Sequence, residues 1–381
     1  MKPTSFIMKP TSFIMKPNSF IKLFFFTILI YTNLTLASSE NTDDVPSSSN
    51  SWPSMVTIYH STGSDWNFQC GASLIDKNWV LTAASCMKGV SAAKELLVII
   101  DEESANVYRG ISEIIIHAEY SRHDNDYAML KIKEVPSSVK SIQLAPPYPI
   151  ESWYWGTTQF KDQYWKTPHW KTPHWETPQV KDLSWDGTVN KVRELDLTRI
   201  SNSLCSKNEK MSGRYGKDWI TDNMICAGQG LGKKGTCDGV SGGPLTVFRG
   251  HTNTWMHLGV SSFGGGCAPY GVYARTSKIT RWVSDLMCSN EEVPDIPLSL
   301  KSSDNGDKTA TIKWSSVSGA TGYHLNYRTK NDGSVKSSLD LKENYFITPK
   351  WASGRSYYVT VNSYKNNCLS KETKEKYITL P

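Results

Sequence analysis

The chain has 381 residues, of which 39% are hydrophobic and 20% are charged. This length suits one large and one small domain, and the composition is that of a globular protein, which excludes a collagen, a coiled coil and a multi-span membrane protein. The formal net charge is +6, but four basic residues (Lys2, Lys9, Lys16 and Lys22) lie in the N-terminal segment. The remaining positive excess is small and scattered, so nucleic-acid binding is not expected.

The N-terminal segment carries the features of a secretory signal. Residues 1–21 repeat a heptad three times, an apolar run covers 23–31, and small residues follow at 37–39. A basic start, a short apolar run and small residues at a cleavage site are typical of a signal peptide, and the run is well short of the ~20 residues of a membrane span. We therefore predict that residues 1–39 are a signal peptide with a repeated leader and that the mature chain is secreted without a membrane span. A signal anchor is the alternative.

The next part of the chain is predicted to be an all-β domain. Residues 40–51 are polar, and we expect a flexible lead-in there. Residues 52–290 hold many short β-branched or alternating runs separated by Gly, Pro and Asn, a spacing typical of a sandwich or barrel. A closing helix is predicted over Thr276–Met287, where apolar residues recur at helical spacing. The clearest strand predictions are at 55–59, 79–83, 96–100, 111–116, 128–132 and 255–260.

An insertion at 161–178 interrupts this pattern. A five-residue unit of the form Trp-Lys-Thr-Pro-His repeats from Trp165 to Pro178. A proline every five residues excludes a helix and a central strand, so an extended loop is predicted. The loop is either a solvated insertion made by local duplication or a contact surface, since exposed aromatic residues are favoured binding anchors. A metal site from His169 and His174 is a third interpretation.

A linker and a second, smaller β domain are predicted at the C-terminal end. Residues 291–297 contain two prolines and two glutamates, and alternation resumes in 298–381. Three motifs stand out in this segment, at Thr309–Trp314, Tyr323–Tyr327 and Gly354–Tyr357. They resemble a fibronectin type III module, which implies a β-sandwich with Trp314 in its core and Tyr357 as its corner tyrosine.

All eight cysteines lie after the predicted signal. An even number of cysteines in a secreted chain is typical of disulfides, although their spacing alone does not select a pairing. No Cys-x-x-Cys pair or Cys/His cluster has the spacing of a zinc site. We therefore expect no metal and no cofactor.

A serine flanked by glycines is the most informative motif. In the stretch Gly239–Pro244, Ser241 can lie on a tight turn that exposes its hydroxyl, with N–H groups nearby to bind an oxyanion. Blocks before and after this motif resemble the chymotrypsin/trypsin-like serine proteases. Residues 70–86 resemble the block of the catalytic histidine, and 117–130 resembles the block of the aspartate, here Asp126. Further family blocks follow in order at 200–205, 223–226, 261–264 and 271–273.

This resemblance covers about 52–290. It implies two six-stranded antiparallel β-barrels, an active site in the cleft between them and a closing C-terminal helix. It also implies three disulfides, which leave Cys288 and Cys368 to bond with each other or with another chain. The implied disulfides are Cys70–Cys86, Cys205–Cys226 and Cys237–Cys267.

The position of the catalytic histidine is occupied by Ser85. A serine hydroxyl cannot accept a proton near neutral pH, so Ser241 has no general base and stays a weak nucleophile. Three other histidines (His60, His117 and His123) stand at different family positions, and none is expected to replace it.

The activation device of the family is also missing. Members of the family are activated by a cleavage that creates a new N-terminus, whose amine pairs with a buried aspartate. Here no cleavage motif precedes Trp52, and Val240 stands at the position of that aspartate. An apolar residue avoids the cost of a buried carboxylate without its cation. The oxyanion donors would be the N–H groups of Gly239 and Ser241, and without this device they need not converge.

The implied specificity pocket lacks the aspartate of trypsin-like members. Gly235 stands at its base, with Gly264 and Gly271 on its walls and Ser262 among its residues. An open pocket would accept a bulky apolar side chain, whereas an unordered pocket would bind nothing.

These features predict a secreted, catalytically inactive serine-protease homologue that binds an extracellular protein or peptide or acts in adhesion. In that case Asp126 is a buried carboxylate hydrogen-bonded to backbone and Ser241 is an inert turn residue. The alternative is an active or weakly active endopeptidase with an apolar pocket and an unidentified base. A further possibility is a purely structural protein without a specific partner.

Overall fold

The computed structural model describes residues 45–47, 54–63, 65–100, 106–146, 180–185, 192–200, 202–207, 219–228, 241–249, 254–264, 271–288, 292–329 and 337–381. The predicted signal peptide (1–39), most of the lead-in and the Trp/Pro-rich insertion (161–178) lie outside them.

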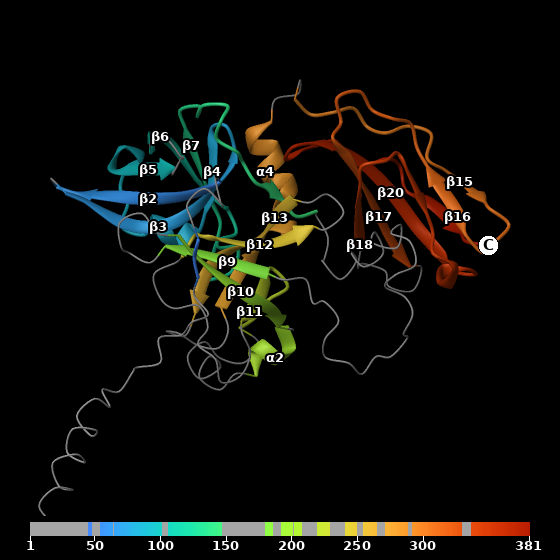
Figure 1. Ribbon diagram of the computed structural model, residues 1–381, viewed down its shortest axis with the longest axis horizontal. Coiled ribbons are helices and arrows are strands. Elements are labelled where there is room, and N and C mark those ends of the chain that lie inside the picture. The colour runs from blue at the N-terminus through green and yellow to red at the C-terminus, as the bar shows by residue number, and fades with distance from the viewer. Residues whose placement is uncertain are drawn as a thin grey trace, which may run out of the picture. The chain divides into compact units, whose positions relative to one another are not determined.

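Six antiparallel strands close into a barrel, coloured blue to green in Figure 1. Its strands β5 (Leu96–Ile100) and β7 (Ala128–Ile132) have the predicted bounds. Leu96, Val98 and Ile100 are buried inside it, while the residues between them are half-buried, because side chains alternate along a strand. The barrel order is β2-β3-β4-β7-β6-β5, and its other strands are β2 (Met55–Thr62), β3 (Asp65–Asp76), β4 (Trp79–Thr82) and β6 (Val107–Ile116).

A second sheet contains eight strands in the order β1-β10-β11-β14-β13-β12-β9, with β8 paired to β13. The strand β9 pairs with both β10 and β12. The core cluster of this sheet includes Leu197, Ile225 and Leu258. The strands are β1 (Val45–Ser47), β8 (Gln143–Leu144), β9 (Val180–Trp185), β10 (Val192–Ile200), β11 (Met224–Gly228), β12 (Pro244–Arg249), β13 (Thr254–Gly264) and β14 (Gly271–Arg275).

The predicted closing helix is divided into two parts. Thr276–Lys278 forms the 3-10 turn η6, and the α-helix α4 covers Thr280–Met287. Ile279 lies between them with φ −110° and ψ 3°, so the helix begins four residues later than predicted. Ile279 and Val283 belong to the core cluster of the barrel, and Trp282 packs against that cluster. The other short helices in the described part are η2 (Ala84–Met87), η3 (Ala93–Glu95), α2 (Asn202–Ser206) and η7 (Lys350–Ala352). None of the described helices has the length and hydropathy of a membrane span.

Strands within residues 301–329 and 337–379 form two further antiparallel sheets around a separate core cluster. Trp314 is 2% exposed, and its ring lies 5.6 Å from that of Tyr323 in an edge-on arrangement. Leu325 and Phe346, from different sheets, both belong to this core. One sheet contains β15 (Lys301–Asp304), β16 (Ala310–Lys313) and β19 (Tyr345–Ile347); the other contains β17 (Gly322–Thr329), β18 (Ser337–Leu341), β20 (Ser356–Lys365), β21 (Cys368–Leu369) and β22 (Lys376–Thr379).

A fully buried histidine joins the barrel to the second sheet. His257 on β13 is 0% exposed, and its Nε2 lies 3.1 Å from Oγ of Ser73 on β3. Burial lowers the pKa of His257 to about 3, because the charged imidazolium is poorly stabilised there. The ring is therefore neutral at physiological pH.

Two leucines test whether the C-terminal core contributes to stability. Leu325 is 2% exposed and Leu298 is 68% exposed. We expect Leu325→Ala to lower the free energy of unfolding by about 2–5 kcal/mol and Leu298→Ala to change it by less than about 0.5 kcal/mol. Urea unfolding of the full chain measures both, and equal effects would contradict the observed core.

The buried histidine predicts an acid-dependent loss of stability. The unfolded chain binds a proton on His257 near pH 6.5, and the folded chain does so only near pH 3. Stability is therefore fully present above pH 6.5 and decreases as the pH falls, by up to about 1.4 kcal/mol per pH unit between these values. Urea unfolding between pH 7 and 4 should show a shallower loss for His257→Gln than for the native chain. Parallel curves would mean that His257 is protonated in the fold.

Candidate functional site

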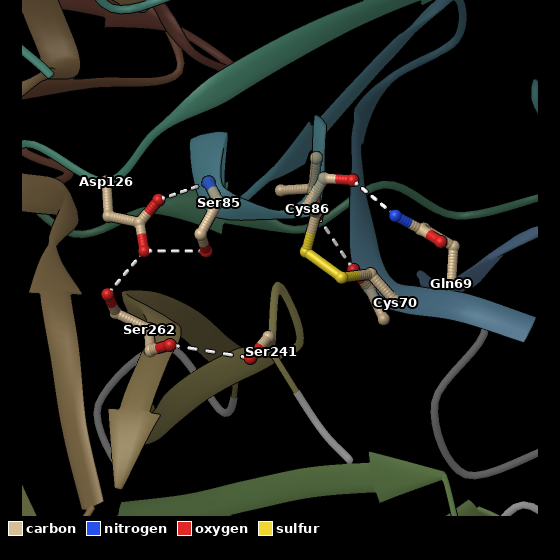
Figure 2. Close-up of a disulfide and its surroundings, with 9 residues drawn as sticks. Gln69, Cys70, Ser85, Cys86, Asp126, Ser241 and Ser262 are labelled. Atoms are coloured by element: carbon tan, nitrogen blue, oxygen red, sulfur yellow. Dashed lines mark hydrogen bonds between the residues drawn. A yellow bond between two sulfur atoms is a disulfide. The ribbon is translucent and has the colours of Figure 1, made fainter. Parts of the chain in front are cut away.

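The site is organised around the carboxylate of Asp126, which is 0% exposed in the loop before β7. The backbone N–H of Ser85 donates to its Oδ1 at 2.7 Å, and the Ser85 hydroxyl donates to its Oδ2 at 2.9 Å. The hydroxyl of Ser262, on β13, donates to the same Oδ2 at 2.5 Å. Figure 2 shows both serines directed toward the carboxylate, Ser85 from the right and Ser262 from below.

These donors replace the water that a buried carboxylate loses. Burial raises the pKa of Asp126 above its usual range, and the hydrogen bonds from Ser262 and Ser85 together with the nearby His123 oppose that shift. Both carboxylate oxygens are therefore occupied by serine donors.

Ser85 is held in place by its neighbours in the chain. It lies on η2, directly after β4, and the adjacent Cys86 is bonded to Cys70 on β3. The side-chain amide of Gln69 also donates to the Cys86 carbonyl at 2.9 Å. Figure 2 shows this disulfide beside the Asp126 cluster. The short helix is thus fixed at both the disulfide and the carboxylate.

Ser241 is close to this cluster but is bonded differently. Its hydroxyl donates to the Ser262 carbonyl at 3.4 Å (Figure 2), and its own carbonyl accepts the N–H of Gly71 at 3.0 Å. Ser262 therefore contacts Asp126 through its side chain and Ser241 through its backbone. No histidine in the described part of the chain donates to or accepts from the Ser241 hydroxyl.

The turn that carries Ser241 requires a glycine at position 242. Gly242 has φ +86°, and its N–H donates to the Ser261 carbonyl at 2.7 Å. A Cβ atom at this position would lie 2.2 Å from the Gly71 carbonyl oxygen and 2.2 Å from Oγ1 of Thr82. A side chain would therefore collide with both β3 and β4.

The three histidines nearest to the predicted site in sequence have other contacts. His60 lies 3.5 Å from a Glu95 carboxylate oxygen. The His117 ring packs 4.9 Å from that of Trp282, and partial burial lowers its pKa. The His123 ring lies 4.5 Å from that of Phe263.

The structure describes only part of the predicted pocket and oxyanion site. Ser262, which is predicted to belong to the pocket, donates its hydroxyl to Asp126, a contact that the sequence did not indicate. Ser261 and Ser262 are adjacent, and only the strand register decides which one faces the carboxylate. Gly264 and Gly271 pair directly at the ends of β13 and β14. Gly235, Gly239, Val240, Cys237 and Cys267 lie outside the described residues.

Three disulfides are present in the described part of the chain. Cys70 is bonded to Cys86 and Cys205 to Cys226. Cys288 is bonded to Cys368, so these two cysteines pair within the chain. Among the described residues, no group of three or more His, Cys, Asp or Glu side chains could hold a metal ion.

Comparisons with known proteins agree with this architecture. A family model described as Trypsin matches residues 42–283. Vitamin K-dependent protein C of Mus musculus is 32% identical over 225 residues, which cover 56% of this chain and 45% of the relative. Transmembrane protease serine 11G of Rattus norvegicus is 27% identical over 258 residues, which cover 63% of this chain and 54% of the relative. The chain thus spans about half the length of these relatives.

Two glycines with the same backbone conformation test the importance of the Ser241 turn. Gly63 has φ +83° with no atom within 4 Å of a built Cβ, whereas a Cβ at Gly242 meets two atoms at 2.2 Å. We expect Gly242→Ala to lower the free energy of unfolding by about 1–3 kcal/mol more than Gly63→Ala, since only the former adds overpacking to backbone strain. Thermal and urea unfolding measure the difference. Equal losses would show that the turn can move away from β3 and β4.

Proposed function

The chain belongs to the trypsin family of serine proteases, and we propose that it is a member without peptidase activity that acts by binding a protein. The observation that carries this proposal is the pair formed by Ser85 and Asp126. Both the N–H and the hydroxyl of Ser85 donate to the carboxylate that would orient a catalytic imidazole.

Acyl transfer by a serine needs a group that accepts its proton. The Ser85 hydroxyl cannot do so near neutral pH, and the Ser241 hydroxyl is bonded to the Ser262 carbonyl. A backbone carbonyl holds that hydroxyl but does not make it a stronger nucleophile. Loss of a triad member typically costs several orders of magnitude in rate, which leaves only the contribution of binding and the oxyanion site.

The sequence supports the same conclusion at the activation step. Val240 stands where the resemblance implies an aspartate, and no activation motif precedes Trp52. A missing base and a missing activation switch are consistent with each other, because neither is needed once catalysis is lost.

We further propose the finer architecture and an extracellular location. The pairing of β9 with both β10 and β12 supports a second six-stranded barrel. The two sheets around Trp314 support a fibronectin type III-like sandwich. The signal-like residues 1–39 and the disulfides support secretion.

Binding is the function that this fold retains without its base. The protein partner proposed here is extracellular, in keeping with the proposed location. Trp66 on β3 is 46% exposed and Tyr108 on β6 is 55% exposed. Exposed aromatic side chains are frequent anchors in protein interfaces, since they bury a large area at a small cost in conformational entropy.

A peptidase assay tests the loss of activity. We expect neither the mature chain nor Ser241→Ala to cleave a broad pool of fluorogenic peptides, while an active trypsin-family enzyme cleaves the pool under the same conditions. A fluorophosphonate probe should likewise leave Ser241 unmodified, because its hydroxyl lacks a base.

Activity in the native chain that Ser241→Ala abolishes would overturn the proposal. It would then favour a serine endopeptidase with an apolar pocket and a base outside the described residues.

A further inference from the structure

The turn between β20 and β21 makes a set of buried polar contacts with the trypsin-like part of the chain. Asn367 is 7% exposed, although it lies in a turn. Its Nδ2 donates to the Ile75 carbonyl at 2.8 Å and to the Ile142 carbonyl at 3.3 Å. Its Oδ1 accepts the N–H of Leu144 at 2.7 Å. One side chain thus contacts three backbone groups that lie more than 220 residues earlier in the sequence.

The residues after Asn367 contact the helix α4. The N–H of Leu369 donates to the hydroxyl of Ser284, which is 1% exposed, at 2.9 Å. The Arg281 guanidinium donates to the carbonyls of Leu369 at 3.0 Å and Ser370 at 2.6 Å. Cys368 lies between these contacts and is bonded to Cys288, the residue that follows α4.

The three hydrogen bonds at position 367 require a carboxamide side chain. It alone among short side chains can donate two hydrogen bonds from one atom and accept one on another. Ile75, Ile142 and Leu144 are themselves buried, so their backbone groups need a protein partner once the turn covers them. A disulfide used only as a tether would not require this match.

We infer that residues 366–370 are a docking element that seats the C-terminal domain on the trypsin-like domain by non-covalent contacts, independently of the disulfide. Asn367 is its central residue, and the occupied surface consists of the end of β3, the strand β8 and one side of α4. The two domains then unfold as one cooperative unit, and the C-terminal domain is an integral part of the fold.

The contacts of β8 extend this connection toward the candidate site. Leu144 pairs with His257 on β13, and the N–H of Ala145 donates to the His257 carbonyl at 2.8 Å. The same strand carries Ser262, which donates to Asp126. The docking element therefore supports the strand that supplies one donor of the buried carboxylate. This holds whether or not the chain has peptidase activity.

Two adjacent asparagines provide a matched test in the disulfide-bonded full chain. Asn367→Asp removes both donors and places a carboxylate oxygen against two carbonyl oxygens. Asn366→Asp makes the same chemical change on an exposed side chain, at φ +54°, a conformation that both Asn and Asp tolerate. Hydrogen–deuterium exchange of peptides that cover residues 141–146 should become about tenfold faster in Asn367→Asp and change by less than about twofold in Asn366→Asp. Equal exchange in the two variants would overturn the inference.

A variant that combines Cys288→Ser with Cys368→Ser removes the disulfide. It therefore separates the contribution of the disulfide to the coupling of the two domains from the contribution of Asn367. We expect this variant to unfold in urea in a single transition, and the further change Asn367→Asp to produce two transitions. Two transitions before that change would show that the disulfide alone joins the domains, contrary to the inference. If the variant does not fold, the exchange comparison in the disulfide-bonded chain decides.

Discussion

The buried carboxylate of Asp126 is the constraint on which the geometry of the site depends. A negative charge without exposure to water is tolerated only where donors surround it. Here η2 and β13 supply these donors through Ser85 and Ser262, so the carboxylate joins the first barrel to the second sheet. Ser85 supplies two of these hydrogen bonds, one from its N–H and one from its hydroxyl.

The surroundings of the site are held in place by a disulfide and by close backbone packing. The disulfide Cys70–Cys86 fixes η2, and Gly242 allows the Ser241 turn to approach β3 and β4. These are packing and backbone requirements, which remain whether or not a proton is transferred. A fold is stabilised by such contacts, whereas its activity depends on a few side chains at one site.

Short apolar runs predicted two strands of the barrel with their exact bounds. The predicted bounds of β5 and β7 agree with the structure, because each strand is a short run of mostly apolar residues. Strand β3 was not predicted, since its first three residues are exposed and only its second half is buried. The closing helix was predicted too early, because Ile279 leaves helical geometry although its side chain joins the core. Hydrophobic spacing reports burial, but it does not report backbone conformation.

The sequence by itself determined the chemical types available at the site. Position 85 is a serine, and no folding can make its hydroxyl a base at neutral pH. Only the tertiary structure decided which of the adjacent serines, Ser261 or Ser262, reaches Asp126, since strand register selects one of them. It also decided that Asn367 contacts Ile75, because a contact between residues 292 positions apart leaves no local pattern. The sequence gives the residue type at each position, whereas tertiary packing selects which residues far apart in the sequence contact each other.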